Sequence, residues 1–158
     1  MTRRSSSFPP ESGAELRARA LRLLARREHS RAELARKLAP HARSAQALQA
    51  VLEALLEKKQ LSDERFAEER VRRLSRKYGA ARIRHDLKAK GIDRELIDRV
   101  SEDGEAERAR AILARKYRTP ATTREERARR ARFLQSRGFS HETIRRALDE
   151  SGLGNENE

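Results

Sequence analysis

The sequence contains no cysteine, and aromatic residues make up only 4% of it. Without cysteine the chain forms no disulfide, has no thiolate nucleophile and builds no zinc site from cysteine ligands. The absence also fits the reducing cytosol. Glycine is sparse, with seven residues in 158, whereas Ala, Leu, Glu, Arg and Lys are abundant. This composition predicts an all-α protein whose contacts are mostly local in the sequence.

Long apolar segments are also missing. No run approaches the length of a membrane-spanning helix, and the N-terminal MTRRSSSFPPESG lacks the hydrophobic region of a signal peptide. Hydrophobic residues make up 36% of the chain and charged residues 40%, so we expect a narrow apolar stripe along each helix in place of a large core. The sequence therefore predicts a soluble, cytoplasmic protein with no membrane partner.

Positive charge is present in large excess. The formal net charge is +13 and the pI is near 11.1. Residues 14–62 carry 11 basic and 5 acidic side chains, residues 65–94 carry 11 and 4, and residues 104–137 carry 11 and 4. Such a surface attracts polyanions or a strongly acidic protein, although an arginine-rich genome would raise the charge in the same way. The spread over three blocks favours an elongated basic face over one compact pocket.

The first helical repeat is expected over residues 13–61. Ser12 with Glu15 and Ser30 with Glu33 have the spacing of capping boxes, and Ser44 is a third N-cap. Apolar residues follow each cap at helical spacing: Leu16, Ala20, Leu23 and Leu24, then Leu34 and Leu38, then Leu48, Val51, Leu52, Leu55 and Leu56.

A second repeat, with the clearest helical pattern, is expected over residues 62–102. Its first helix is predicted from Ser62 to Tyr78, its second from Ala80 to Lys90, and its third after the N-cap Asp93. The predicted buried residues are Phe66, Val71 and Leu74, then Ala80, Ile83 and Leu87, then Leu96, Ile97 and Val100.

The third repeat is expected over residues 103–151. Its first helix should end near Tyr117, Thr123 and Glu126 have capping-box spacing before the second helix, and Ser140 should cap the last. The predicted buried residues are Ala109, Ile112 and Leu113, then Ala128, Ala131 and Leu134, then Ile144, Ala147 and Leu148.

These segments predict an all-α fold of three tandem three-helix repeats in an elongated, curved arrangement. A weak internal repeat supports it, since Gly91-Ile92-Asp93-x-Glu95-x-Ile97 parallels Gly138-Phe139-Ser140-x-Glu142-x-Ile144. Residues 1–12 are expected to form a disordered basic tail and residues 152–158 a frayed acidic one.

Catalytic motifs are missing. The histidines, His29, His41, His85 and His141, lack metal-ligand spacing, and we expect surface or turn roles for them. His141-Glu142 begins an HExxH-like string, but position 145 is arginine. There is no phosphate-binding glycine loop and no nucleophile elbow. The sequence therefore predicts a protein that is not an enzyme and that uses no metal or cofactor.

Exposed basic residues in the second and third repeats are the candidates for binding. Arginine suits bidentate contact with phosphate or carboxylate. For any single arginine a solvated helix face is the simpler explanation, but the regional excess argues for the set. The predicted site residues are Arg72, Arg73, Arg76, Lys77, Arg82, Arg84, Lys88, Lys90, Arg129 and Arg132.

Several strings together resemble a known family. LARREHSRAELARKL, LSDERFAEERVR, the pattern Gly79-x-x-x-Ile83-x-x-x-Leu87-x-x-x-Gly91-Ile92, and FLQSRGFSHETIRRAL occur in this order between Ala18 and Leu148. In order and spacing they resemble the RecX family of bacterial recombination regulators. The sequence departs from the family at His29, where tyrosine is common, and in the polar loop RTPATT.

The resemblance implies a modulator, chiefly an inhibitor, of the RecA recombinase. Members consist of tandem three-helix repeats, bind the groove of the RecA filament on DNA, and suppress its ATPase, strand-exchange and coprotease activities. They thereby affect DNA recombination, repair and the SOS response. We accordingly expect a monomer whose partner is the RecA filament and which binds single- or double-stranded DNA weakly.

The alternative is a sequence-tolerant DNA-binding protein whose three-helix units act like helix-turn-helix motifs. The string SRAELARKL has the small-residue and leucine spacing of such motifs. A plain DNA-binding protein should act without RecA, whereas a filament regulator should act at amounts well below saturation of the DNA.

Overall fold

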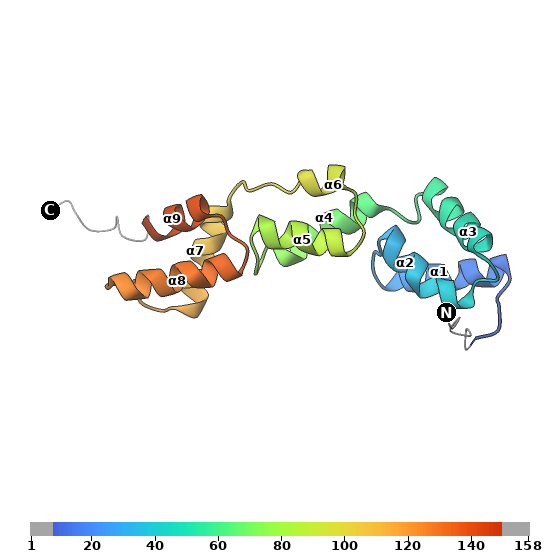
Figure 1. Cartoon of the computed structure of the whole chain (residues 1–158), viewed down its shortest axis with the longest axis horizontal. Coiled ribbons are helices and arrows are strands. Elements are labelled where there is room, and N and C mark those ends of the chain that lie inside the picture. The colour runs from blue at the N-terminus through green and yellow to red at the C-terminus, as the bar shows by residue number, and fades with distance from the viewer. Residues whose placement is uncertain (1–7, 150–158) are drawn as a thin grey trace, which may run out of the picture. The chain divides into compact units, whose positions relative to one another are not determined.

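The computed structural model describes residues 8–149, and all regular structure in this range is helical apart from one isolated bridge between Glu11 and Ala42. Figure 1 shows the order of the helices along the chain. They are α1 (Gly13–Arg26), α2 (Arg31–Leu38), a 3-10 turn η1 (Ala39–His41), α3 (Ala45–Glu57), α4 (Asp63–Leu74), α5 (Ala80–Ala89), α6 (Arg94–Asp98), α7 (Glu105–Lys116), α8 (Arg124–Ser136) and α9 (His141–Asp149). The prediction of an all-α fold is confirmed. The tail predicted at 152–158 and most of the one predicted at 1–12 lie outside the described residues.

The chain forms two compact units, and the division passes through α4 and α5. The first unit contains the described residues up to Glu69 together with Lys88–Asp93. The second contains Arg70–Leu87 and the described residues from Arg94 onward. Each unit has its own hydrophobic core.

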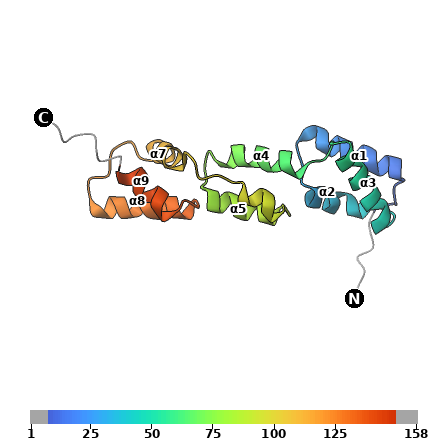
Figure 2. The same cartoon turned by 90° about the horizontal axis from the view of Figure 1, so that it is seen from above.

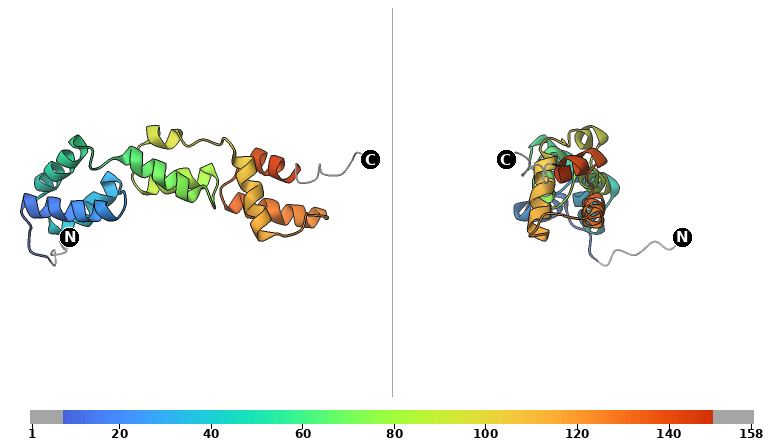
Figure 3. Two further views of the ribbon diagram at one scale, coloured as in Figure 1. Left: turned by 180° about the vertical axis from the view of Figure 1, so that it is seen from behind. Right: turned by 90° about the vertical axis from the view of Figure 1, so that its left-hand side faces the viewer.

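In the first unit α1, α2 and α3 supply most of the core, and Figure 3 shows these helices from behind. Each helix begins at the predicted cap, because the hydroxyls of Ser12, Ser30 and Ser44 accept the backbone N–H three residues later. The buried residues of this core are Leu16, Ala20, Leu34, Leu38, Val51, Leu52, Leu55 and Leu61.

The second predicted capping box is only half formed. Ser30 accepts the backbone N–H of Glu33 at 3.1 Å, but the carboxylate of Glu33 does not return to Ser30. It accepts two hydrogen bonds from the Arg27 guanidinium, at 2.5 and 3.0 Å. A bidentate charged pair is stronger than the neutral backbone contact, so Arg27 takes this carboxylate.

His29 lies in a turn, one of the two roles predicted for the histidines, and it is buried there. Only 2% of it is exposed, in the turn between α1 and α2. Its Nδ1 lies 3.0 Å from the Arg27 carbonyl and its Nε2 lies 3.0 Å from Nζ of Lys37. Burial lowers the pKa of His29. The neutral ring, with Nδ1 donating to the carbonyl and Nε2 accepting from Lys37, satisfies both contacts.

Residues of the second predicted repeat also belong to the first unit. The buried hydroxyl of Ser30 donates to the Lys90 carbonyl at 2.8 Å, and Asp63 accepts the backbone N–H of Arg31 at 2.7 Å. These bonds satisfy the polar groups at the start of α2 with partners far along the sequence.

Two helices of the second repeat are shorter than predicted. The first ends at Leu74, not at Tyr78, because the Lys77 and Tyr78 N–H groups both donate to the Leu74 carbonyl and close a tight last turn. The third, α6, ends at Asp98, so Val100 is buried in the segment after the helix. Ile83 and Leu87 are buried, as predicted.

In the second unit α9 packs on both α7 and α8 (Figure 2). Thr123 and Glu126 form the complete predicted capping box at the start of α8. The buried core consists of Ala109, Ile112, Leu113, Leu134, Phe139, Ile144, Ala147 and Leu148. Ala128, which we predicted to be buried, is exposed, so the apolar stripe of α8 is narrower than the sequence suggested.

Candidate functional site

Two turns meet within the second unit and fix the position of the candidate surface. The Gly79 N–H donates to the Arg137 carbonyl at 2.8 Å, and the Ala81 N–H donates to the Gly138 carbonyl at 3.3 Å. A Cβ added to Gly79 would lie 2.4 Å from the carbonyl oxygen of Gly138. The turn before α5 therefore lies directly against the turn between α8 and α9, at a distance that only glycine allows.

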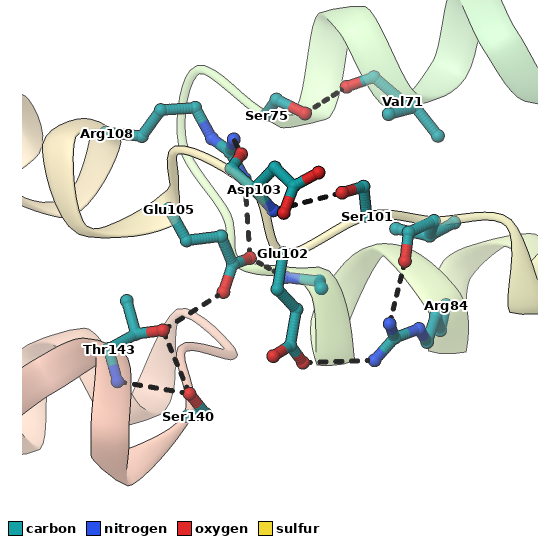
Figure 4. Close-up of polar contacts among 12 residues, drawn as sticks. Val71, Ser75, Arg84, Ser101, Glu102, Asp103, Glu105, Arg108, Ser140 and Thr143 are labelled. Carbon is teal, nitrogen blue, oxygen red and sulfur yellow. Dashed lines mark hydrogen bonds and ion pairs between the residues drawn. The ribbon is translucent and has the colours of Figure 1, made fainter.

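Glu105 holds the same junction from the other side. Its side chain is 1% exposed, and its carboxylate accepts the backbone N–H of Ala80, the first residue of α5, at 2.6 Å. The same carboxylate accepts hydrogen bonds from the hydroxyl of Thr143 at 3.4 Å and from the guanidinium of Arg108 at 3.3 Å. Figure 4 shows these side chains around Glu105. Burial raises the pKa of Glu105, and the Ala80 bond opposes this shift. Glu105 thus joins the starts of α5, α7 and α9.

Arg84 differs from the other predicted site residues. Its guanidinium donates to the Val100 carbonyl at 2.7 Å and to the Glu102 carboxylate at 3.4 Å. Figure 4 shows Arg84 pointing toward Glu102. The side chain is partly buried and ties α5 to the segment before α7. Arg84 therefore has a structural partner, which its position beside the apolar stripe did not predict.

The other nine predicted residues keep their charged groups available. Within the described residues their side chains form no hydrogen bond or ion pair. All are exposed except Lys90, which is partly buried. Those in the second unit are Arg72, Arg73, Arg76, Lys77, Arg82, Arg129 and Arg132, and those in the first unit are Lys88 and Lys90.

Many other arginines are neutralised within the fold. Arg19 pairs with Glu11, Arg27 with Glu33, Arg65 with Glu28 and Arg70 with Asp86. In these pairs the positive charge is already matched by a carboxylate, which leaves less of it for a partner. Only the basic side chains without an internal partner therefore offer their full charge to a binding partner.

The structure adds aromatic residues that the sequence analysis did not single out. Tyr78, Tyr117 and Phe133 are partly exposed and each lies against basic side chains. Arg82 and Arg137 lie 5.1 and 5.4 Å from the Tyr78 ring, Arg137 and Lys116 lie 5.1 and 3.9 Å from Phe133, and Lys116 and Arg130 lie 5.7 and 4.4 Å from Tyr117. We call these three rings and four cations the aromatic–cation surface.

A sequence signal for this surface exists. The tripeptide Arg-Lys-Tyr occurs at residues 76–78, just after α4, and again at residues 115–117, where it forms the end of α7 and its C-cap. The two copies meet in the structure, where the Arg115 guanidinium donates to the Arg76 carbonyl at 2.8 Å.

A hollow adjoins Tyr117, between α7, the loop after it and α8. Arg110, Arg118, Arg127 and Arg130 line it together with Tyr117. No carboxylate lines the hollow itself, although Arg110 and Arg127 form ion pairs with Glu107 and Asp149. Arg118 makes no hydrogen bond or ion pair with any described residue. The chemistry of the hollow suits an anion with several oxygen atoms.

Other kinds of site are not found in residues 8–149. This part of the chain has no group of three or more His, Asp or Glu side chains that could hold a metal ion. It also has no helix long and apolar enough to cross a membrane.

Comparison with known proteins identifies the fold. Family models described as the first, second and third three-helix domains of RecX match residues 17–55, 62–100 and 103–148. The crystal structure of RecX from Lactobacillus salivarius superimposes with a TM-score of 0.79 at 21% identity, covering 89% of this chain and 97% of that one. The prediction of three three-helix repeats is confirmed.

Curated relatives are similar over most of their length. "Regulatory protein RecX" from Herbaspirillum seropedicae is 46% identical over 147 residues, covering 91% of this chain and 96% of the relative. The protein of the same name from Neisseria meningitidis serogroup A is 43% identical over 135 residues, covering 84% and 88%. The relatives carry the name of a regulatory protein, and this chain belongs to the RecX family.

Proposed function

We propose that this protein regulates the RecA recombinase, chiefly as an inhibitor, by binding in the groove of the RecA filament on DNA. Binding there suppresses ATP hydrolysis, strand exchange and coprotease activity, and so affects recombination, repair and the SOS response. The protein acts in the cytoplasm as a monomer, by contact alone and without catalysis or a cofactor. Membership of the RecX family supports this assignment.

The observation that carries the proposal is the unpaired charge of the second and third domains. Arg72, Arg73, Arg76 and Lys77 lie within six residues and have no internal acidic partner among residues 8–149. Because these guanidinium and ammonium groups have no internal partner, no ion pair has to be broken when they bind. They are therefore available to DNA phosphates and to acidic protein groups. We propose that these four residues, with Arg82, Lys88, Lys90, Arg129 and Arg132, contact the filament, whereas Arg84 supports the fold.

The test is to remove four of these charges and measure binding to RecA filaments. The variant carries glutamine at positions 72, 73, 76 and 77, and the readout is the anisotropy of the labelled protein with RecA assembled on single-stranded DNA. We expect the dissociation constant to rise about tenfold or more at moderate salt.

A matched control removes the same number of charges from the first domain. Arg26, Arg36, Arg43 and Lys58 are exposed and have no described partner, and their glutamine variant should bind within about twofold of the unchanged protein. Equal loss in both variants would mean that net charge alone governs binding. Undiminished binding of the first variant would show that the contact lies elsewhere.

A further inference from the structure

We propose that the aromatic–cation surface is a binding site for single-stranded nucleic acid, in which bases stack on Tyr117 and Tyr78 and the hollow beside Tyr117 holds a phosphate. The proposal deepens the expectation that the chain binds DNA weakly, because it assigns that binding to named rings and arginines and predicts a preference for single strands. Its test contains no recombinase, so its failure and that of the proposed function are separable.

The first argument is the density of contacts between rings and cations. Here six of them lie between residues 78 and 137, and they involve three rings. One pair would be ordinary packing. A continuous series that alternates ring and cation from Tyr78 to Tyr117 resembles the surfaces that bind single strands, where stacking and phosphate contacts alternate.

The second argument is the distribution of the aromatic residues. The chain has two Tyr and four Phe residues. Phe66 and Phe139 are 4% exposed and lie in the cores, whereas both tyrosines and Phe133 remain partly exposed on the aromatic–cation surface. A protein this poor in aromatic side chains has placed half of them at one basic surface, where stability alone would favour full burial.

The third argument is the charge of the hollow. Of the four arginines that line it, Arg110 pairs with Glu107 at 3.4 Å and Arg127 with Asp149 at 2.9 Å, whereas Arg118 has no partner within the described residues. Arg130 is oriented by the hydrogen bond from its guanidinium to the Thr119 carbonyl, at 2.7 Å, and lies over the Tyr117 ring. A phosphate bound here would lie within a nucleotide's reach of that ring. Bases also stack on guanidinium planes, so Arg130 itself offers a stacking surface.

Arginines attract two kinds of anionic partner, an acidic protein segment and a nucleic acid. The aromatic rings favour the nucleic acid, for the following reason. An acidic protein segment would need the arginines but would gain little from flat rings beside them. A single strand uses both groups, because every base has a π-face and every linkage has a phosphate. A duplex uses only the arginines, since its bases are stacked inside the helix. The surface therefore predicts a preference for single strands that does not depend on sequence.

The direct test uses the tyrosines as reporters, since the chain contains no tryptophan. Tyr78→Phe leaves Tyr117 as the sole source of intrinsic emission, and Tyr117→Phe leaves Tyr78. We expect single-stranded oligothymidylate to quench both signals as it binds, whereas duplex DNA and polyglutamate bind without comparable quenching. Binding of the oligonucleotide with no change in either emission would overturn the proposal.

Variants test whether stacking contributes to affinity. Tyr117→Leu keeps an apolar side chain against the core, and we expect it to weaken single-strand binding between about fivefold and a hundredfold, as loss of one stacked base does. Tyr117→Phe should bind within about twofold, and so should Phe8→Leu, which removes an exposed aromatic residue from the first unit. Circular dichroism confirms that each variant is folded.

Duplex DNA separates stacking from charge. We expect Tyr117→Leu to leave duplex binding unchanged and Arg118→Gln to weaken both ligands while lowering the salt dependence by about one ion. Equal losses on single and double strands in Tyr117→Leu would overturn base stacking. So would preferential loss of polyglutamate binding, which would assign the surface to an acidic protein.

Discussion

The two buried glutamates show how one residue type serves opposite purposes. Glu33 is paired with Arg27, and hydrogen bonding by that guanidinium lowers its pKa to about 2. Glu105 is held mainly by the backbone N–H of Ala80 at the positive end of a helix, and burial raises its pKa. Glu33 thus stabilises the turn between α1 and α2 as an anion. Glu105 instead fixes the position of the start of α5, although burial disfavours its charged form.

Removing the Glu105 carboxyl group should destabilise the second unit. Glu105→Ala leaves the Ala80 N–H buried without its partner, and we expect a loss of about 2 kcal/mol in the free energy of unfolding. Glu105→Gln retains an acceptor oxygen and should lose about half as much. Urea unfolding at neutral pH measures both. Glu107→Ala, an exposed change on the same helix, is the control and should stay within about 0.5 kcal/mol.

The pH dependence of stability should reveal Glu33. Because its folded-state pKa lies below the ordinary value of 4.5, its contribution is present above that value and is lost as the pH falls toward about 2. A shift of this size corresponds to about 3 kcal/mol. Unfolding of Glu33→Gln should therefore show a smaller fall in stability between about pH 5 and pH 2. Parallel curves for the two proteins would contradict the assignment.

Glu105 should contribute a pH dependence of stability that is opposite in sign to that of Glu33. Its raised pKa means that its contribution to stability is fully present below the ordinary value and is lost as the pH rises through the folded-state value. Between these values Glu105→Gln should flatten the dependence of unfolding free energy on pH, and Glu107→Gln should not.

At the scale of elements, turns determine which surfaces meet. Gly138 has φ +87°, and an added Cβ would lie 2.5 Å from Cβ of Arg82. The turns around Gly79 and Gly138 pack closely and bring Tyr78 and Arg82 toward Arg137 and Phe133. The aromatic–cation surface depends on this contact between short turns.

Alanine at position 138 should disrupt that contact. The left-handed backbone and the clash with Arg82 together predict a loss of at least about 2 kcal/mol in unfolding free energy. Gly13→Ala is a matched control, because Gly13 has no atom within 4 Å of the added Cβ. We expect it to be neutral or slightly stabilising in the same urea titration. An equal effect of both substitutions would mean that the turn contact contributes nothing.

Local signals explain why much of the fold was predictable. Ser12, Ser30, Ser44 and Thr123 cap helices as their spacing predicts, and apolar residues at helical spacing form both cores. The end of α4 was placed wrongly, because Tyr78 continues the apolar pattern while the backbone has already turned. Cap residues and hydrophobic periodicity act over a few positions, and predictions over this distance along the chain were accurate.

The site was predictable only in part, because its contacts join distant residues. Basic side chains at positions 72–77 could be proposed from charge alone. Sequence spacing could not show that Arg84 bonds the Val100 carbonyl or that Tyr78 and Phe133 share Arg137. Partners of this kind depend on tertiary packing, which no local pattern encodes.

At the scale of the whole molecule, the proposed function depends on basic side chains that have no internal partner. The net charge of +13 leaves many cations without an ion pair among residues 8–149, and those proposed to contact the filament lie in the second and third domains. Binding to a RecA filament should therefore weaken steeply with salt, since each phosphate contact releases counterions. The test is to measure the dissociation constant for the RecA filament at several salt concentrations from low to moderate. A flat dependence would mean that unpaired charge does not drive the association.

The most direct measurement is the steady-state ATPase of RecA on single-stranded DNA, titrated with this protein at fixed moderate salt. A parallel arm measures how much of the same DNA the protein occupies without RecA. The proposed function predicts that ATP hydrolysis falls at protein concentrations far too low to cover the bare DNA. Undiminished hydrolysis, or a loss only when the DNA is saturated, would contradict a filament regulator and favour a plain DNA-binding protein.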